Sequence, residues 1–513
     1  MRAAMVIAVA LAVTGCASLP ALEGRIETRA LANTGETRLA KSVAPLVAAH
    51  PGKTGIHALA NPLDAFAARV LLASTAEKSL DVQYYIWRDD QTGYLLFDAL
   101  WRAAERGVRV RLLLDDNNTK GLDEVIGVLD DHPNIEVRLY NPVAYRGARM
   151  LNFLTDFERV NRRMHNKSFT ADNRVTIVGG RNVGNEYFGA GEDVLFADLD
   201  VMAVGPAVQE VSNAFDLFWN SASAYPASLL VPKAAADARE RLEAKFVEVG
   251  AEPESRKYED AVRRTPLVTN LLDGKLDLEW DDARVVRDDP AKTLDTAERH
   301  DVLLLTDLLQ NFGRPEESFD LVSPYFVPGK NGTKAISSLA QRGVSTRVLT
   351  NSLSATDVSA VHAGYSKWRK PLLEAGVKLY ELKSTSSVLE GDEKKERKEK
   401  KGSSPESLHA KTFALDRKRI FVGSFNFDPR SALLNTEMGL VIDSPALATR
   451  LSDAMDSGLA KNAYELGLTR EGEIEWIEHD PAGDKRYDTE PQTTAFKRAA
   501  VWFLSLLPID WLL

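Results

Sequence analysis

The residues of this chain that are best suited to chemistry fall into one pattern, which occurs twice. Each copy reads His-x-Lys-x4-Asp and is followed, ten residues after the aspartate, by an asparagine. The two sets are His165, Lys167, Asp172 and Asn182, and His409, Lys411, Asp416 and Asn426. The chain has only 8 histidines among 513 residues, so two such patterns at matching places are not a chance result.

A pocket built from both copies would suit a phosphodiester. Residues i and i+2 of a strand share one face, so His165 is expected to lie beside Lys167. Lysine ammonium and asparagine amide groups hold nonbridging phosphate oxygens and offset the charge of the transition state. One imidazole can attack phosphorus while the other protonates the leaving oxygen. The product is a covalent phosphohistidine, which is released to water or to an acceptor alcohol.

A histidine that attacks must be neutral and held in one tautomer, usually by a carboxylate on its other ring nitrogen. Glu437 lies 21 residues beyond Asp416, and Asp198 has the comparable place in the first copy. We predict that Glu437 and Asp198 are the orienting groups. The alternative is that Asp172 and Asp416 orient the rings; otherwise these two secure the turn behind each motif.

Composition limits the other chemistries. With 64 basic and 74 acidic side chains the net charge is −10, which weighs against nonspecific nucleic-acid binding, so no nucleic-acid partner is expected. A single cysteine rules out an internal disulfide framework, a Cys-based zinc site and an iron–sulfur cluster. Further metal ligands at suitable spacing are missing, and so is a GxxxxGK[ST] loop. We therefore expect no metal and no cofactor.

The elements that must position the two motifs are duplicated as well. Apolar runs, Gly breaks and helical patterns predict strand, helix, strand in each copy, which implies parallel strands with right-handed crossovers and an α/β fold. The predicted elements are 79–87, 95–104 and 106–114 in the first copy and 318–327, 334–340 and 342–350 in the second. A further strand is expected at 135–140 and at 377–380.

The chain divides into six parts on this basis. They are a signal peptide (1–16), an N-terminal segment (17–60), the first half (61–225), a helical charged linking region (226–300), the second half (301–480) and a C-terminal segment (481–513). The run 383–407 is highly charged and of low complexity, and is predicted to be a solvated surface loop; contact of its basic residues with anionic lipid is the alternative.

Both ends of the chain point to a membrane. Residues 1–16 hold an apolar run too short to span a bilayer, followed by Val13-Thr-Gly-Cys16, which resembles a bacterial lipobox. Lipidation of Cys16 is predicted, an ordinary cleaved signal being the alternative, and Ala17 suggests outer-membrane sorting. At the other end, 499–513 is apolar and follows Lys497-Arg498, so it is either an interfacial segment or packed on the protein's own core.

At these residues the chain resembles the phospholipase D superfamily, whose members carry two HKD motifs. The resemblance extends to Gln83-Tyr-Tyr-Ile-Trp87, Ser323-Pro-Tyr-Phe-Val-Pro-Gly329 and Val361-His-Ala-Gly-Tyr365, and it is strongest to the bacterial C-type cardiolipin synthases. It implies two duplicated phospholipase D-like α/β/α sandwich halves with the active site at their interface.

The resemblance also implies a phosphatidyltransferase that makes cardiolipin from phosphatidylglycerol and a second phospholipid, for which phosphatidylethanolamine is one candidate. His165 and His409 would be nucleophile and general acid, with His165 favoured as nucleophile, and the lysines and asparagines would surround the phosphate. Gly180 and Ser424, at matching places, make the halves inequivalent and are candidate substrate-binding positions. His362 is a further candidate substrate contact, with surface or core packing as the alternative. The membrane surface is a further expected partner, and the need for an accessory protein is left open.

Two other functions share the motifs. A phospholipase D that hydrolyses phospholipid to phosphatidic acid would use the same catalytic residues and differ only in admitting water. A nuclease or an inactive binding module is disfavoured by the acidic charge and by the intact motifs. For location the predictions converge on the cell envelope, with the chain anchored at Cys16, facing the periplasm, at the outer membrane.

Overall fold

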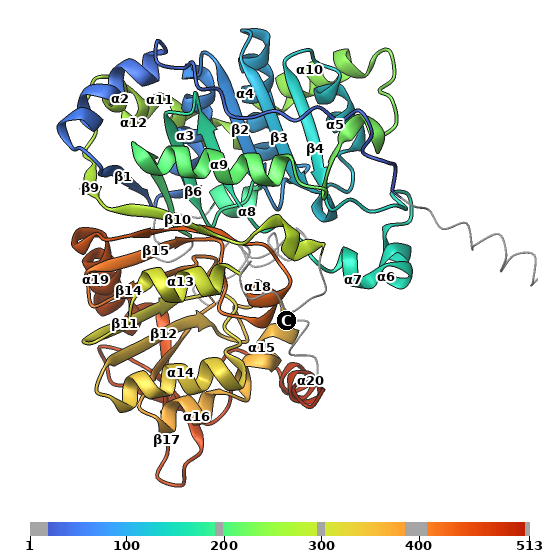
Figure 1. Ribbon diagram of the computed structural model, residues 1–513. Coiled ribbons are helices and arrows are strands. Elements are labelled where there is room, and N and C mark those ends of the chain that lie inside the picture. The colour runs from blue at the N-terminus through green and yellow to red at the C-terminus, as the bar shows by residue number, and fades with distance from the viewer. Residues whose placement is uncertain (1–18, 190–197, 295–302, 385–407, 508–513) are drawn as a thin grey trace, which may run out of the picture.

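Two halves stacked on one another make up the protein, each built around a mixed β-sheet (Figure 1). The computed structural model describes residues 19–189, 198–294, 303–384 and 408–507. Cys16 and nearly all of the charged run 383–407 lie outside these residues.

The first sheet has nine strands in the order β8-β4-β3-β2-β5-β6-β7-β1-β9. Its strands are β1 (Thr54–Leu59), β2 (Ser79–Tyr84), β3 (Arg109–Asp115), β4 (Ile135–Tyr140), β5 (Ser168–Ala171), β6 (Val175–Gly179), β7 (Asp200–Val204), β8 (Ala224–Pro226) and β9 (Glu279–Asp281). The helices of this part are α2 (Arg38–Ala49), α3 (Pro62–Thr75), α4 (Gln91–Glu105), α5 (Asp123–Asp130), α6 (Asn152–Thr155), α7 (Phe157–Val160), α8 (Asn185–Phe188), α9 (Pro206–Trp219), α10 (Ala238–Ala251), α11 (Arg256–Arg264) and α12 (Leu267–Leu272).

The second sheet has ten strands in the order β10-β16-β15-β14-β11-β12-β13-β17-β18-β19. Its strands are β10 (Ala283–Arg287), β11 (Ser318–Val322), β12 (Ser345–Asn351), β13 (Lys378–Leu382), β14 (Thr412–Leu415), β15 (Arg419–Gly423), β16 (Met438–Ile442), β17 (Ala463–Leu468), β18 (Ile474–Glu478) and β19 (Lys485–Tyr487). Its helices are α13 (Leu304–Phe312), α14 (Gly329–Gln341), α15 (Ser359–Ser366), α16 (Arg369–Glu374), α18 (Pro429–Leu433), α19 (Pro445–Asn462) and α20 (Ala495–Ser505).

The two sheets share one strand order over eight strands. Reading β8 to β1 in the first sheet and β17 to β10 in the second gives the same succession of parallel and antiparallel neighbours, with β2, β3 and β4 matching β11, β12 and β13. Helices lie on both faces of each sheet: α9 packs on the face of the first sheet opposite α3 and α4, and α19 does so in the second half opposite α14 and α16. The prediction of a duplicated α/β/α sandwich is confirmed.

The duplicated Arg-Gly-Val segments end the first crossover helix of each half. Gly107 follows α4 with φ +89° and Gly343 follows α14 with φ +90°. Glycine adopts this left-handed conformation without steric cost, so the chain turns from helix into the next parallel strand. The same local signal therefore produces the same βαβ unit in both halves.

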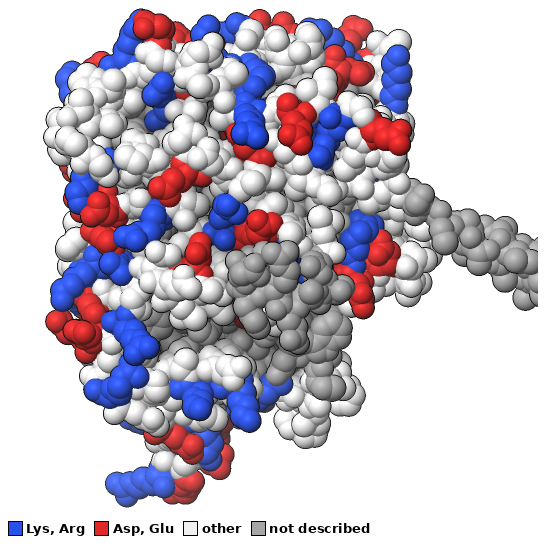
Figure 2. Space-filling view, viewed as in Figure 1, with Lys and Arg blue, Asp and Glu red and all other residues white. Residues whose placement is uncertain are grey.

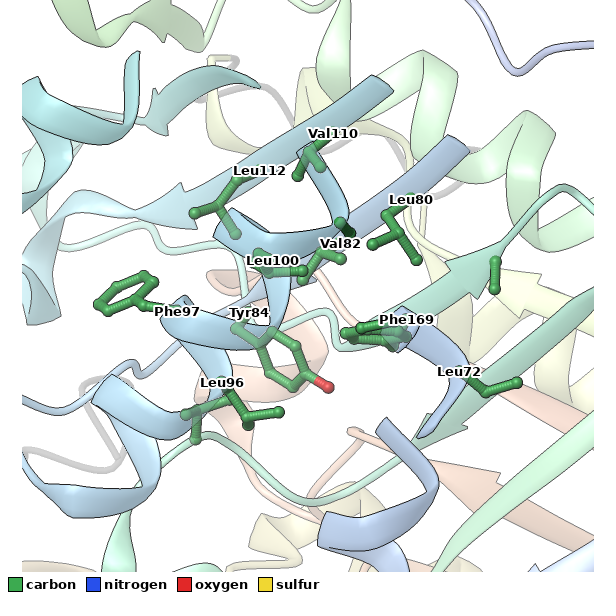
Figure 3. Packing of buried hydrophobic residues seen from close by; sticks show 14 of the residues in the cluster. Leu72, Leu80, Val82, Tyr84, Leu96, Phe97, Leu100, Val110, Leu112 and Phe169 are labelled. Carbon is green, nitrogen blue, oxygen red and sulfur yellow. The ribbon is translucent and has the colours of Figure 1, made fainter. Parts of the chain in front are cut away.

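Apolar side chains separate into one core for each half and a third cluster between them. In the first half, Leu80 and Val82 of β2 pack with Leu112 of β3 and with Leu96 and Leu100 of α4 (Figure 3). The cluster between the halves joins residues from the two sheets and their helices: Ile56, Val178, Val201 and Val211 from the first, and Val422, Met438, Leu440 and Leu447 from the second. Burial of this apolar surface holds the halves together.

One short segment also ties the sheets to each other. β9 pairs with β1 in the first sheet, and β10 pairs with β16 in the second, although only Asp282 separates β9 from β10. The range 226–300, predicted as a helical linker, thus holds helices α10, α11 and α12 and, in addition, a strand for each sheet.

Two predicted elements differ from the structure in detail. The strands expected at 79–87 and 318–327 end at Tyr84 and Val322, after which the chain makes only the isolated bridges Trp87↔Val183 and Phe326↔Phe427. Across the described ranges, no helix has both the length and the apolar character needed to cross a bilayer.

Candidate active site

Both motif histidines lie where the two halves meet. His165 follows α7 and precedes β5, and His409 precedes β14. The backbone N–H of His165 donates to the carbonyl of Thr436 at 2.8 Å, and Met164 forms a parallel bridge with Thr436. The motifs begin in extended chain just before each strand rather than within it, which corrects the expectation that His165 and Lys167 share a strand.

Each histidine is paired with a carboxylate of the other half. His165 Nδ1 lies 2.8 Å from Glu437 Oε2, and His409 Nδ1 lies 2.6 Å from Asp198 Oδ2. Because the carboxylate engages Nδ1, it fixes the tautomer that leaves Nε2 for a substrate. The structure therefore brings together the orienting groups predicted from sequence, crossed between the halves.

The His165 pair is deeply buried. Burial, and then the charges of Lys167, Lys411 and His409, hold the pKa of His165 well below its usual range. Burial also raises the pKa of Glu437 to about 7, against the opposing charge of Lys167. His165 is consequently uncharged near neutral pH, which is the form that can attack phosphorus.

The His409 pair has a different electrostatic character. Burial opposes ionisation of Asp198, but His409, Lys411 and Arg181 outweigh it and lower the pKa of this carboxyl. Burial and Lys411 lower the pKa of His409, while Asp198 acts in the opposite direction. The His409 side chain is 25% exposed, against 8% for His165. An ionised Asp198 favours the protonated His409 ring that a general acid needs.

Two buried lysines supply positive charge at this interface. Lys167 Nζ donates to the carbonyl of His165 at 2.5 Å, and Lys411 Nζ donates to the carbonyl of His409. Burial lowers the pKa of Lys411 to about 8, in spite of Asp198 and Glu437, and lowers that of Lys167 well below its usual range. A bound phosphodiester anion would oppose this effect of burial and favour the charged ammonium form of both lysines.

The two asparagines have unused hydrogen-bonding capacity. Asn182 Oδ1 accepts from the backbone N–H of Ile86 at 3.2 Å. Among the residues that the structure describes, no group has hydrogen-bond geometry to the buried Nδ2 of Asn182 or the buried Oδ1 of Asn426. A buried amide without a partner is costly, so these groups are consistent with a phosphate ligand.

Gly180 and Ser424 serve the two carboxylates differently. A Cβ at Gly180 would lie 2.2 Å from Asp198 Oδ1, so only glycine leaves room for that carboxylate. At the matching position Ser424 Oγ donates to Glu437 Oε2 at 2.5 Å. The two positions thus support the orienting groups, and a substrate contact at either of them remains a prediction.

The motif aspartates lie behind the site. Asp172 accepts hydrogen bonds from the backbone N–H groups of 77, 78 and 79, and Asp416 accepts from those of 316, 317 and 318. Their φ values are +50° and +52°. Each aspartate thus fastens the turn after the motif strand to the start of β2 or β11, and neither is bonded to a motif histidine.

The contacts of His362 lie within the second half. Its ring is 3% exposed, its Nε2 lies 2.9 Å from Glu490 Oε1, and Arg369 lies against the same nitrogen. Glu490 also accepts from Arg369 at 2.6 Å. Of the two readings of His362, packing within the second half agrees with these contacts, and substrate contact has no support from them.

Sequence reasoning did not single out several residues around the rings. Tyr85 lies edge-on to His165 with centroids 4.9 Å apart, and Tyr187 lies likewise 5.0 Å from His409. Asp288, whose pKa burial raises to about 6, accepts from the backbone N–H of Glu437 at 2.7 Å. Tyr85 falls within a stretch that carried the family resemblance, but Tyr187 and Asp288 have no local signal because only the fold brings them here.

Tyr325 and Asp357 form a pair near Lys411. The Tyr325 hydroxyl donates to Asp357 at 2.9 Å. The negative charge of Asp357 partly offsets the burial that lowers the pKa of Lys411.

Within the four described ranges there is no cluster of three or more His, Cys, Asp or Glu side chains that could hold a metal ion.

Comparison with known proteins gives a consistent result. The family described as cardiolipin synthase, PLD-like domain, matches residues 71–219 and 308–458, one match in each half. Cardiolipin synthase C of Escherichia coli (strain K12) is 48% identical over 479 residues, which cover 93% of this chain and 100% of that protein. An uncharacterized protein of Helicobacter pylori (strain ATCC 700392 / 26695) is 31% identical over 90% of this chain and 89% of its own.

A solved structure shares the fold. The crystal structure of the phosphatidylserine synthase of Haemophilus influenzae Rd KW20 superposes with a TM-score of 0.55 over 89% of this chain and 95% of that one, at 14% identity. The two family matches, each containing one histidine motif, and the near full-length similarity lead to one conclusion: the chain belongs to the phospholipase D-like family of cardiolipin synthases.

Proposed function

We propose that this protein is a phosphatidyltransferase that makes cardiolipin from phosphatidylglycerol and a second phospholipid through a phosphohistidine. The observation that carries the proposal is the crossed pairing of His165 with Glu437 and of His409 with Asp198. It provides two imidazoles, each held at Nδ1 by a carboxylate, beside two buried lysines. The similarity to Escherichia coli cardiolipin synthase C supports the choice of lipid product.

In the first step His165 Nε2 attacks phosphorus of the donor phospholipid. The bond from phosphorus to the headgroup oxygen breaks, and His409 gives its Nε2 proton to that oxygen. The phosphatidyl group is then held on His165 by a P–N bond. Lys167 and Lys411 offset the charge that builds on the nonbridging oxygens, and the amides of Asn182 and Asn426 hold those oxygens in place.

In the second step a headgroup hydroxyl of phosphatidylglycerol attacks the same phosphorus. His409 takes the hydroxyl proton, the P–N bond breaks, and cardiolipin leaves with both histidines restored. Burial lowers the pKa of both rings, but Asp198 stays ionised whereas burial raises the pKa of Glu437 to about 7. His165 is therefore the better nucleophile and His409 the better acid.

Hydrolysis is the second candidate, and one observation favours it. The His409 side chain is 25% exposed, so water has a path to the ring that would activate it. The same phosphohistidine would then yield phosphatidic acid. Transfer wins only where the acceptor lipid is held in place and water is kept out.

The proposal extends to the location of the enzyme. A phospholipid substrate implies work at a membrane, and the lipobox-like Val13-Thr-Gly-Cys16 supports a lipid anchor on Cys16 in the cell envelope, with Ala17 favouring the outer membrane and a periplasm-facing site. Two further questions are which phospholipid is the donor, with phosphatidylethanolamine as one candidate, and whether an accessory protein is required. The lipid assay described next answers both.

The test is lipid mass spectrometry of a cardiolipin-free bacterial host that expresses the chain, beside its His409→Ala variant. Cardiolipin with the wild type alone would support transfer and assign it to this site. Phosphatidic acid without cardiolipin would favour hydrolysis. Cardiolipin from the His409→Ala variant at near wild-type levels would refute the two-histidine mechanism. Repeating the assay with single purified lipids identifies the donor, and activity that appears only in cell extract reveals an accessory protein.

A further inference from the structure

A short projection of the first half exposes large apolar side chains just before the first motif. We call it the finger, residues 149–157, which covers η2 (Arg149–Leu151), α6 and the start of α7. Its exposed apolar residues are Met150 (76%), Leu151 (43%), Leu154 (82%) and Phe157 (38%). Chance exposure of single apolar residues is normal, but four in eight residues make a patch.

Buried polar contacts hold the base of the finger. Arg146 donates to Asp116 at 2.7 Å and to Asp123 at 2.5 Å, and Arg149 donates to the carbonyl of Asp116 at 2.5 Å. The side chain of Asn152 bonds the N–H and carbonyl of Tyr145 at 2.9 and 3.1 Å. The apolar tip is therefore presented to solvent by an ordered base, which indicates a surface made for contact.

Helix α20 presents a second apolar surface in the other half. Its exposed residues are Phe496 (85%), Trp502 (64%) and Phe503 (59%), followed by Leu506 (62%) and Leu507 (36%). On its opposite side Val501 packs with Leu353 and Ala363, and Lys497 Nζ donates to the carbonyl of Leu353 at 2.6 Å. The finger and α20 project on the same side of the molecule (Figure 1). The surface at α20 is mostly uncharged in the space-filling view, although the helix also carries Lys497 and Arg498 (Figure 2).

Both surfaces connect directly to the active site. The finger continues through α7, which ends at Val160, five residues before His165. Helix α20 packs on α15, which begins two residues after Asp357, whose charge acts on Lys411. A body that touched both surfaces would thus lie against the edge of the catalytic interface.

We infer that the finger and α20 form a two-point docking surface for a phospholipid bilayer, one point on each half. This inference rests on the proposed function, since a lipid-transferring site must receive its substrates from a bilayer. The exposed tryptophan, phenylalanine and leucine side chains match the chemistry of the membrane interface, where such groups enter the boundary between headgroups and acyl chains. Arg149 of the finger and Arg146 at its base already contact Asp116, so the finger docks through its apolar side chains.

The test places a fluorophore at each point. Cys16 is the only cysteine, so a full-length Cys16→Ser protein can be labelled at one chosen position with an environment-sensitive dye. The labelled variants are Leu154→Cys in the finger, Phe503→Cys in α20 and, as matched control, Leu309→Cys in α13, where Leu309 is 69% exposed. The probe is a vesicle of phosphatidylglycerol and phosphatidylethanolamine, and the background includes a His409→Ala version.

On adding vesicles we expect brighter, blue-shifted emission from positions 154 and 503 but not from 309. A silent dye at 154, whether or not 503 responds, would overturn two-point docking. A shift at 154 that needs no vesicles and grows with protein concentration would show contact with a second copy and would also overturn it. Because this readout needs no turnover, the His409→Ala protein is expected to respond equally, so a failure of the proposed function is seen separately.

A kinetic test complements the labelling. Leu154→Ser with Phe157→Ser removes apolar area that would enter the bilayer, and we expect turnover of vesicle lipid to fall about tenfold or more. Turnover of a short-chain phosphatidylglycerol below its micelle concentration is expected to stay unchanged, as is vesicle turnover by Leu309→Ser. Equal losses on both substrates would mean damage to the site and would overturn the docking role of the finger.

Discussion

Replacing Gly180 by alanine tests the proposed role of the carboxylate behind His409. The added Cβ would lie 2.2 Å from Asp198 Oδ1, whereas such contacts are essentially never shorter than 3.0 Å. The carboxylate must therefore retreat by most of an ångström, although Oδ1 also accepts from the backbone N–H of Leu199 at 2.8 Å. We expect the 2.6 Å contact between Asp198 and His409 to be lost.

The size of the effect follows from the charge on Asp198. A hydrogen bond to a charged group contributes about 1.5–3 kcal/mol, so its loss in the transition state lowers kcat by about 10- to 150-fold. KM should change little, because the lysines that hold the phosphate are untouched. The assay is steady-state transfer with purified protein, with thermal unfolding to verify that Gly180→Ala remains folded.

Two companion variants make the result specific. Gly250→Ala, in α10, is the matched control because a Cβ there meets nothing within 4 Å, and it should leave kcat unchanged. Asp198→Asn should lower kcat as well, and the double variant with Gly180→Ala should lose little more than either single variant, since both act on one contact. A folded Gly180→Ala protein with wild-type kcat would refute the role assigned to Asp198.

Three further outcomes are expected. Asp172→Ala removes the acceptor of three backbone N–H groups and should lower the free energy of unfolding, measured by urea denaturation, by roughly 3 kcal/mol or more. Asp172→Asn should lower it less. Equal stability of the wild type and both variants would contradict the role of Asp172 in the turn. The pKa of Lys411 is lowered to about 8, so its positive charge is present below that pH and lost above it. We therefore expect kcat/KM to fall above about pH 8. A profile of kcat/KM that stays flat to about pH 9.5 would count against Lys411 as a phosphate ligand. A chelator should leave the rate unchanged, because the two lysines supply the charge; a loss that added divalent cation restores would contradict this.

Much of the fold could be predicted because the chain repeats its own signals. The Arg-Gly-Val segments mark the same helix-to-strand turn at Gly107 and Gly343, and the apolar runs beside them are buried parallel strands. Strand ends were harder to place. Apolar character continues past Tyr84 and Val322, but the ladder stops there and only isolated bridges follow.

The candidate site was predictable in its parts and not in its pairing. Spacing identified Glu437 and Asp198 as matching positions, but it cannot show that each serves the histidine of the other half, since that depends on how the two sheets face each other. Tyr187 was missed for the same reason: only the fold brings it to His409, a residue of the other half. His362 belonged to a segment typical of the family, yet its partner Glu490 lies 128 residues away and holds it in the interior.

The crossed carboxylates make the two copies depend on each other. Neither half holds a complete acid–base unit, so a lone half would present a histidine without its orienting partner. Because both halves belong to one chain, they are always present in a one-to-one ratio. The neighbouring strands β9 and β10 pair with different sheets and so join the two halves covalently through a single short segment. The two copies are nevertheless unequal, with glycine behind the carboxylate in one and serine in the other. Two identical copies would give two equivalent histidines, whereas here each ring has its own electrostatic surroundings.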